Sequence, residues 1–140
     1  MTLQSNLDCK IIIPARYKSS RFEGKPLAQI LNVPMIKRVW LQCIQVVQED
    51  NVFVATDSNK IKDYCSSEGI KSIMTSETCL TGTDRVFEAS NKLDADLYIN
   101  VQGDEPLIDP LDIQKVIDES LKNPDDVINA MSEISDERDF

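Results

Sequence analysis

The sequence contains no histidine, and this absence disfavours many metal centres and many hydrolytic mechanisms. It has four cysteines, which are widely spaced and form no C-x-x-C pair: Cys9, Cys43, Cys65 and Cys79. A zinc site of the usual cysteine and histidine type is therefore not expected. Free cysteine behaves as a small buried apolar residue, so we interpret these four as reduced side chains that mostly fill space in the core.

Long apolar runs and an excess of positive charge are also missing. No run approaches the roughly 20 apolar residues that span a bilayer, and residues 1–10 lack the features of a signal peptide. We therefore expect no membrane contact and a cytoplasmic location. The 15 basic residues against 24 acidic ones give a net charge of −9, which disfavours a general electrostatic attraction to nucleic acid. An anionic ligand would need a local basic site.

The composition is that of an ordinary folded domain, with 41% hydrophobic and 28% charged residues in a chain of 140. Short β-branched or apolar runs predict strands over residues 9–14, 51–55, 71–75 and 96–102, with a further strand beginning in 127–131. Apolar residues at helical spacing predict a helix from Pro34, with apolar positions as far as Val47. A second helix is predicted from the Thr56-Asp57-Ser58 cap to about residue 68, closed by Gly69.

Two more helices complete the predicted pattern. One follows the polar stretch 76–84 and has the apolar positions Val86, Phe87, Ala89 and Leu93. The other opens at Pro110, ends at Asn123-Pro124 and directs five apolar residues toward the core: Leu111, Ile113, Val116, Ile117 and Leu121. Strands that alternate with helices predict an α/β three-layer sandwich with a mostly parallel sheet. In such sheets ligands bind beyond the carboxyl ends of the strands, after residues 13, 55, 73 and 101.

The segment from Pro14 to Pro26 is unusually basic. It carries four positive side chains in thirteen residues: Arg16, Lys18, Arg21 and Lys25. Hydroxyl groups and a flexible backbone are added by Ser19, Ser20 and Gly24. Such a loop offers point charges, planar guanidinium groups and N–H donors to polyphosphate oxygens. The alternative is a solvated basic loop on an acidic protein, but its position directly after the first strand favours a phosphate site.

The usual glycine-rich nucleotide motifs are absent. The sequence has neither G-x-x-x-x-G-K-[ST] nor G-x-G-x-x-G, so side chains would hold most of the phosphate here. This favours a nucleotide bound as a substrate and disfavours ATP hydrolysis that drives motion.

The end of the fourth predicted strand delivers the pentapeptide Gln102-Gly103-Asp104-Glu105-Pro106 to the same sheet edge. Magnesium typically takes one or two protein carboxylates together with substrate phosphates, so Asp104 facing the basic loop is suited to nucleotidyl transfer. Gln102 can donate and accept hydrogen bonds to a base or ribose. The alternative is a turn with a solvated aspartate.

A third segment, 81–85 (TGTDR), has hydroxyl groups and a glycine that can hold a pyrimidine edge. Its Thr81 and Asp84 also have the chemistry of a helix cap, and capping alone accounts for much of the pattern.

Taken in order, IIIPARYKSSRFEGKPL, VFVATDS, TGTDR and DLYINVQGDEPLI resemble the 3-deoxy-manno-octulosonate cytidylyltransferase family, also called CMP-KDO synthetases. The resemblance covers nearly the whole chain. It implies a nucleotide-diphospho-sugar transferase-like α/β domain and an enzyme that makes a CMP-sugar acid and pyrophosphate from CTP and an eight-carbon sugar acid. It also implies Mg²⁺ as cofactor, a homodimer in the full-length protein and a role in lipopolysaccharide or capsule biosynthesis.

Residue by residue, the resemblance places the CTP site on three segments. The residues that it implies for CTP binding are Pro14, Ala15, Arg16, Ser19, Arg21, Lys25, Thr81, Gly82 and Gln102. Within this set Ala15 and Arg16 would lie near the base, and Thr81-Gly82 matches a Ser-Gly pair that helps to recognise cytosine. Asp104 matches the family's magnesium ligand. We assign catalytic roles to Arg16, Lys25 and Asp104, which would stabilise charge on the phosphates while the sugar hydroxyl attacks without a protein nucleophile.

This sequence departs from the family pattern in three ways. Phe22-Glu23 replaces the usual Leu-Pro, which alters the stiffness of the loop beside Lys25. Residues 76–80 replace a polar run that often contains Arg, Asp and His, so contacts from that run to base or sugar are not expected. Family members are also longer, with a second metal-binding aspartate, sugar contacts and most of the dimer interface in their later half. We therefore expect residues 1–140 to be an incomplete nucleotide-binding domain, with weak nucleotide affinity and no turnover alone.

Two alternatives stay open at this point. The first is a cytidylyltransferase for another sugar acid or for a sugar or polyol phosphate, because the nucleotide half says little about the acceptor. The second is a non-catalytic nucleotide-binding module that keeps the basic loop without the chemistry.

Overall fold

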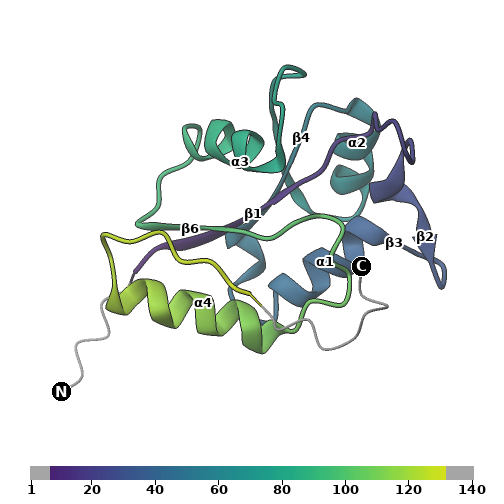
Figure 1. Cartoon of the computed structure of the whole chain (residues 1–140). Coiled ribbons are helices and arrows are strands. Elements are labelled where there is room, and N and C mark those ends of the chain that lie inside the picture. The colour runs from purple at the N-terminus through teal and green to yellow at the C-terminus, as the bar shows by residue number, and fades with distance from the viewer. Residues whose placement is uncertain (1–6, 132–140) are drawn as a thin grey trace.

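A four-stranded parallel sheet forms the centre of the structure, a computed structural model that describes residues 7–131. Its strands are β1 (Cys9–Pro14), β4 (Val52–Thr56), β5 (Lys71–Met74) and β6 (Leu97–Asn100). Their order across the sheet is β5-β4-β1-β6, so β1 lies at the centre, paired with β4 on one side and β6 on the other (Figure 1). The four predicted strands of the sheet are confirmed, each to within two residues at either end.

Helices cover both faces of this sheet. They are α1 (Met35–Cys43), α2 (Asn59–Ser67), α3 (Gly82–Ser90) and α4 (Pro110–Lys122). In Figure 1, α3 lies on one side of the sheet and α1 and α4 lie on the other. The predicted three-layer α/β sandwich is therefore confirmed. Two 3₁₀ turns, η1 (Lys25–Leu27) and η2 (Glu49–Asn51), and a short hairpin of β2 (Gln29–Ile30) and β3 (Val33–Pro34) complete the fold.

Alternation along β1 divides the core between the two faces, because successive side chains of a strand point to opposite sides. Ile11 and Ile13 pack with residues of α1, α2 and α4, whereas Ile12 packs with α3. All three isoleucines are fully buried. Burying such a side chain stabilises the fold by about 1.5–3 kcal/mol, so the β-branched run fixes β1 as the middle strand.

Capping residues lie at the ends of the helices; those of α2 were predicted from the sequence, whereas Asp109 at α4 was not. Ser58 accepts a hydrogen bond from the Ile61 N–H at the start of α2, and Gly69, with a φ of 69°, follows the end of that helix. Asp109 caps α4, and Pro110 begins it. These interactions satisfy amide groups at the first turn that have no partner within the helix.

Several predictions at the ends and faces of elements are wrong. Residues 127–131 form no strand, and Val127 and Met131 are almost fully exposed, because no strand of the sheet lies beside them. Helix α1 ends at Cys43, before the last apolar positions of the predicted helix. Leu111 and Leu121 do not face the core and are exposed, as is Phe87 on α3. A helix buries only one stripe, and apolar residues beside that stripe remain in water.

Chain order creates a crevice at the sheet edge. The chain runs from β1 to β4 and β5 in one direction and then crosses to β6 on the other side of β1. In open α/β sheets such a reversal leaves a crevice beyond the carboxyl ends of the strands. The loops that follow β1 and β6 therefore meet there. Within residues 7–131 we find no helix that is both long and apolar enough to cross a membrane.

Candidate active site

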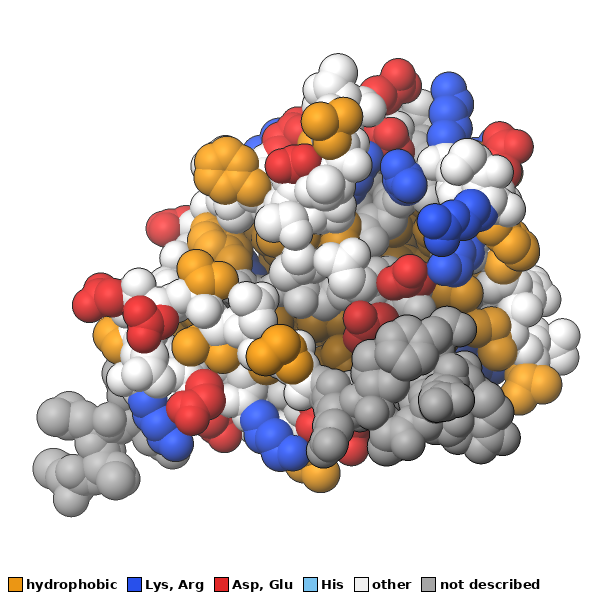
Figure 2. All heavy atoms as spheres, viewed as in Figure 1, with side chains coloured by type: hydrophobic (Ala, Val, Ile, Leu, Met, Phe, Trp, Pro, Cys, Tyr) orange, Lys and Arg blue, Asp and Glu red, His pale blue; other side chains and the backbone are white. Residues whose placement is uncertain are grey.

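The crevice at the carboxyl edge of the sheet is an open pocket of about 730 Å³. Its walls come mainly from three segments that are distant in sequence: the 14–26 loop after β1, residues 79–85 at the start of α3, and residues 102–104 after β6. Met35 of α1 also lines it. On the face shown in Figure 2, basic side chains gather at the right, over the region where Figure 1 shows the 14–26 loop. The charge pattern of the sequence thus becomes a local basic wall on an acidic protein.

The 14–26 loop folds into a compact turn and does not extend freely into solvent. The Gly24 N–H donates to the Tyr17 carbonyl at 2.7 Å, which closes the loop into a compact turn. Gly24 has a φ of 71°, and a Cβ there would lie 3.0 Å from the Tyr17 ring, so only glycine fits without strain. The ammonium group of Lys60 on α2 lies 4.7 Å from the centre of the same ring. Tyr17 therefore anchors the loop to the body of the domain.

Directly after this turn, Lys25 opens the short η1 turn and faces Asp104 across the pocket. Their Nζ and Oδ2 atoms are 3.4 Å apart, and both side chains are about half exposed (44% and 57%). The contact joins the loops that follow β1 and its neighbour β6. An exposed ion pair of this kind contributes only about 0–1 kcal/mol to the stability of the fold. Stability alone therefore does not account for the Lys25–Asp104 pair.

Close backbone packing brings the Asp104 loop against β1. A Cβ at Gly103 would lie only 2.7 Å from the Pro14 carbonyl oxygen, and Gly103 is buried. Such an approach is possible only for glycine. Glycine at this position therefore allows Asp104 to lie beside the start of the basic loop.

The opposite wall begins at the cap of α3. The Thr81 hydroxyl accepts from the Asp84 N–H at 3.1 Å, and the Asp84 carboxylate accepts from the Thr81 N–H at 3.0 Å. This capping box confirms the capping interpretation of the segment. A Cβ at Gly82 would lie 2.8 Å from Gln102 Oε1, so the absence of a side chain at Gly82 lets the Gln102 amide approach the helix start. Gln102 also donates from Nε2 to Asn100 Oδ1 at 2.9 Å.

The structure brings all the residues predicted for the site to one place. Every one of them lines the pocket: Pro14, Ala15, Arg16, Ser19, Arg21, Lys25, Thr81, Gly82, Gln102 and Asp104. Pro14 and Ala15 are buried at its base, whereas Arg16 and Arg21 are exposed. Glu105 is exposed and is not part of the lining. The roles of these residues toward CTP stay predictions.

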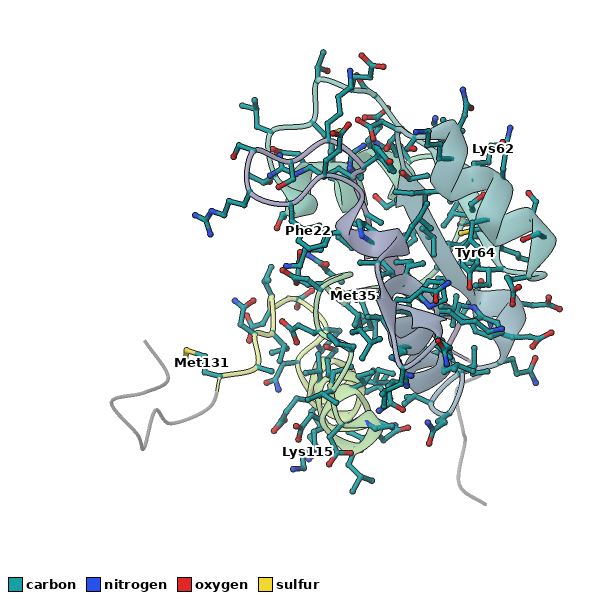
Figure 3. All side chains as sticks on the ribbon, turned by 90° about the vertical axis from the view of Figure 1, so that its right-hand side faces the viewer. Phe22, Met35, Lys62, Tyr64, Lys115 and Met131 are labelled. Carbon is teal, nitrogen blue, oxygen red and sulfur yellow. The ribbon has the colours of Figure 1, made fainter. Side chains whose placement is uncertain are left out.

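Several lining residues were not assigned to the site from the sequence, although five of them lie in segments that the sequence singled out: Ser20, Phe22, Pro26, Arg85 and Gly103. Met35, Cys79 and Leu80 were missed altogether. Figure 3 labels Phe22 and Met35. For Arg85 a signal was available, because it lies one and four residues before Val86 and Ala89 and so falls on the buried stripe of α3. A charged residue on such a stripe indicates a specific partner.

The donor set around Asp104 fits a magnesium ion that is shared with a ligand. Within residues 7–131 no group of three or more Asp, Glu, Cys or His side chains could hold a metal by itself. Magnesium commonly takes one or two carboxylates and completes its shell with water and phosphate oxygens. A single half-exposed carboxylate beside a basic wall meets that requirement only when phosphate is present.

All four cysteines are free, and three of them are buried, which confirms their predicted packing role. Burial raises the pKa of the Cys43 thiol to about 12. Cys79 is partly exposed at the pocket and donates to the Glu88 carboxylate at 3.0 Å. This hydrogen bond is the main cause that lowers the pKa of Glu88, with a smaller contribution from the Ser76 N–H.

Comparisons with known proteins identify the family of this chain. A family model described as cytidylyltransferase matches residues 10–139. The 3-deoxy-manno-octulosonate cytidylyltransferase of Arabidopsis thaliana, named as mitochondrial, is 49% identical over 121 residues, which are 85% of this chain and 42% of that protein. The 8-amino-3,8-dideoxy-manno-octulosonate cytidylyltransferase of Shewanella frigidimarina (strain NCIMB 400) is 47% identical over 117 residues, or 81% of this chain and 48% of that protein.

A solved structure is similar as well. It is described as CMP:2-keto-3-deoxy-manno-octonic acid synthetase complexed with CTP, and it superposes with a TM-score of 0.80 at 42% identity, covering 84% of this chain and 49% of that one. The chain thus spans about half the length of the proteins that it matches. The resemblance seen in the motifs is confirmed, and the chain belongs to the cytidylyltransferase family.

Proposed function

We propose that this chain forms the CTP-binding part of an enzyme that joins CMP to a 3-deoxy-manno-octulosonate-type sugar acid and releases pyrophosphate. The observation that carries the proposal is the juxtaposition of Lys25 and Asp104, 3.4 Å apart, in one pocket between the loops after β1 and β6. A basic wall facing a single carboxylate is suited to a triphosphate with its metal. The names of the relatives support the choice of CTP and of the sugar acid.

In the proposed reaction the anomeric hydroxyl oxygen of the sugar acid forms a bond to the α-phosphorus of CTP. The bond from that phosphorus to the bridging oxygen breaks, pyrophosphate leaves with the electron pair, and the hydroxyl proton is released. Arg16 and Lys25 stabilise the negative charge on the phosphates, which is the largest contribution that a preorganised site makes to phosphoryl transfer. No protein nucleophile and no histidine are needed.

Asp104 is the residue that would hold Mg²⁺, which when bound supplies charge neutralisation and a lower pKa for a coordinated hydroxyl. The ion pair with Lys25 keeps the Asp104 carboxylate directed to the basic wall formed by the 14–26 loop. Thr81 and Gly82 face this wall from the start of α3 and are proposed to recognise cytosine, with Gln102 beside them.

The acceptor is proposed more broadly than the nucleotide. Relatives that act on 3-deoxy-manno-octulosonate and on its 8-amino-8-deoxy analogue are similar to this chain at nearly the same identity, 49% and 47%. Lipopolysaccharide or capsule biosynthesis, the homodimer and the cytoplasmic location also stay proposals for the whole protein. An acceptor screen on the full-length protein, read as pyrophosphate release, distinguishes the two acids.

The nucleotide claim is tested on the chain itself by calorimetry with CTP, UTP, ATP and GTP, with and without Mg²⁺. We expect a preference for CTP and a loss of binding in Lys25→Ala. Lys62→Ala is the matched control, because Lys62 on α2 is exposed, does not line the pocket and points away from the protein body in Figure 3. Equal affinity for all four nucleotides, or equal effects of the two substitutions, would refute the proposal.

A further inference from the structure

Arg85 on α3 is the buried charge of this domain. Its side chain is 3% exposed, and within residues 7–131 it is the one charged residue whose accessibility falls in the buried range. A charge taken out of water destabilises the fold unless it is paired and hydrogen-bonded. The groups that pair with Arg85 therefore indicate the role of this buried side chain.

Those partners lie at the carboxyl ends of two neighbouring strands. Arg85 Nη1 donates to Thr75 Oγ1 at 2.6 Å and to the Ser76 carbonyl at 3.2 Å, directly after β5. Arg85 Nη2 lies 3.7 Å from the Asp57 carboxylate, directly after β4. The planar guanidinium group thus joins α3 to the loops that follow β4 and β5, a geometry that a lysine ammonium cannot reproduce in full.

The segment that Arg85 holds, residues 75–81, forms one wall of the candidate active site through Cys79, Leu80 and Thr81. Its other side-chain attachments also come from α3. Glu88 accepts from the Ser76 N–H at 2.9 Å and from the Cys79 thiol at 3.0 Å. A helix that binds a loop at both ends sets the position of that loop relative to the rest of the pocket.

We propose that Arg85 is a positioning residue that holds segment 75–81 so that Thr81 and Gly82 face the 14–26 loop across the pocket. Arg85 lines the pocket, but its guanidinium group is engaged by Thr75, Ser76 and Asp57. In this proposal its effect on CTP is exerted through the wall that it holds. The part of this inference that concerns CTP rests on the proposed function, whereas the part that concerns the segment does not.

The test uses Cys79 as a reporter of the segment, because Cys79 is partly exposed while Cys9, Cys43 and Cys65 are buried. Burial raises the pKa of the Cys79 thiol and the charge of Arg85 lowers it, so the rate of alkylation by iodoacetamide is measured over a range of pH and expressed per thiolate. In Arg85→Met we expect this rate for Cys79 to rise at least about tenfold, while the three buried thiols stay protected. The dissociation constant for CTP, measured by calorimetry on the same chain, should rise about tenfold.

Two further variants keep the proposal falsifiable. Arg85→Lys retains the charge, and it should fold and give intermediate values for both the Cys79 rate and the CTP affinity. Arg38→Met is the matched control, because Arg38 also fixes a loop, through the Ile30 carbonyl in the β2–β3 hairpin, but does not line the pocket. This control should change neither the Cys79 rate nor the CTP affinity.

The outcomes separate the two parts of the inference. An unchanged Cys79 rate in Arg85→Met, or an equal acceleration of all four thiols in both Arg85 variants, would overturn the positioning role. A faster Cys79 with unchanged CTP affinity would overturn the link to the ligand. A wild-type chain that binds no CTP would overturn the proposed function and the link to the ligand, while the thiol rates would still test the positioning role.

Discussion

Replacing Gly103 by alanine should damage both the fold and the pocket, and the structure sets the size of the effect. The new Cβ would lie 2.7 Å from the Pro14 carbonyl oxygen, whereas such carbon–oxygen contacts are ordinarily about 3.3 Å or longer. The two backbones must therefore separate by roughly half an ångström, because the obstacle is a main-chain atom of the central strand and cannot rotate away. Overpacking of this kind typically destabilises a protein by about 1–3 kcal/mol.

The same displacement moves Pro14 and Asp104 apart at the floor of the pocket, so CTP should also bind about tenfold more weakly. Urea unfolding gives the first quantity, and calorimetry gives the second. Gly69→Ala is the matched control. Gly69 has a φ of 69° with no neighbouring atoms within 4 Å of the added Cβ, so alanine there should destabilise the fold by about 1–2 kcal/mol without changing CTP affinity. A Gly103→Ala protein with wild-type stability and CTP affinity would refute the close approach of β1 and the Asp104 loop.

Two further predictions concern a side-chain contact and a buried thiol. In Gly82→Ala the added Cβ meets the flexible end of the Gln102 side chain, so the free energy of unfolding should stay within about 1 kcal/mol of the wild-type value. The affinity for CTP should fall about fivefold by calorimetry. An unchanged affinity would argue against a role for the Gly82–Gln102 contact. Burial raises the pKa of Cys43 from its ordinary value of 9.0 to about 12, so the folded state disfavours the thiolate and stability should fall as pH rises from 9 toward 12. Urea unfolding at pH 8, 9 and 10 should show a shallower decline in Cys43→Ala, and parallel declines would show that this thiol is not responsible.

Much of the fold could be predicted because local and tertiary preferences agree. The run Ile11 to Ile13 favours a buried strand on intrinsic grounds and is buried on both faces. The β2–β3 hairpin was missed, since its turn residues Leu31 and Asn32 both have positive φ, and leucine gives no signal for that conformation. The exposed Leu111 was also unpredictable, because helical spacing does not say which edge of an apolar stripe meets the core.

The candidate site shows the same division. The basic loop and Asp104 could be placed together because each follows a strand, and parallel strands bring their carboxyl ends to one edge. The pairing of Lys25 with Asp104 needed coordinates, as did the contacts of Arg85, because they depend on side-chain reach across three loops. Residue type and spacing therefore predict where the site lies, whereas the side-chain contacts within it depend on tertiary packing.

The central claim is that Asp104 acts with magnesium on a bound triphosphate, and the CTP affinity of Asp104→Asn tests it most directly. Without Mg²⁺ the substitution removes a negative charge beside the phosphates, so CTP should bind about threefold more tightly than to wild type. With Mg²⁺ it removes the metal ligand, so CTP should bind about tenfold more weakly. Asp63→Asn on α2 is the control, since Asp63 is exposed and does not line the pocket. A change of the same sign under both conditions, or none, would contradict the account.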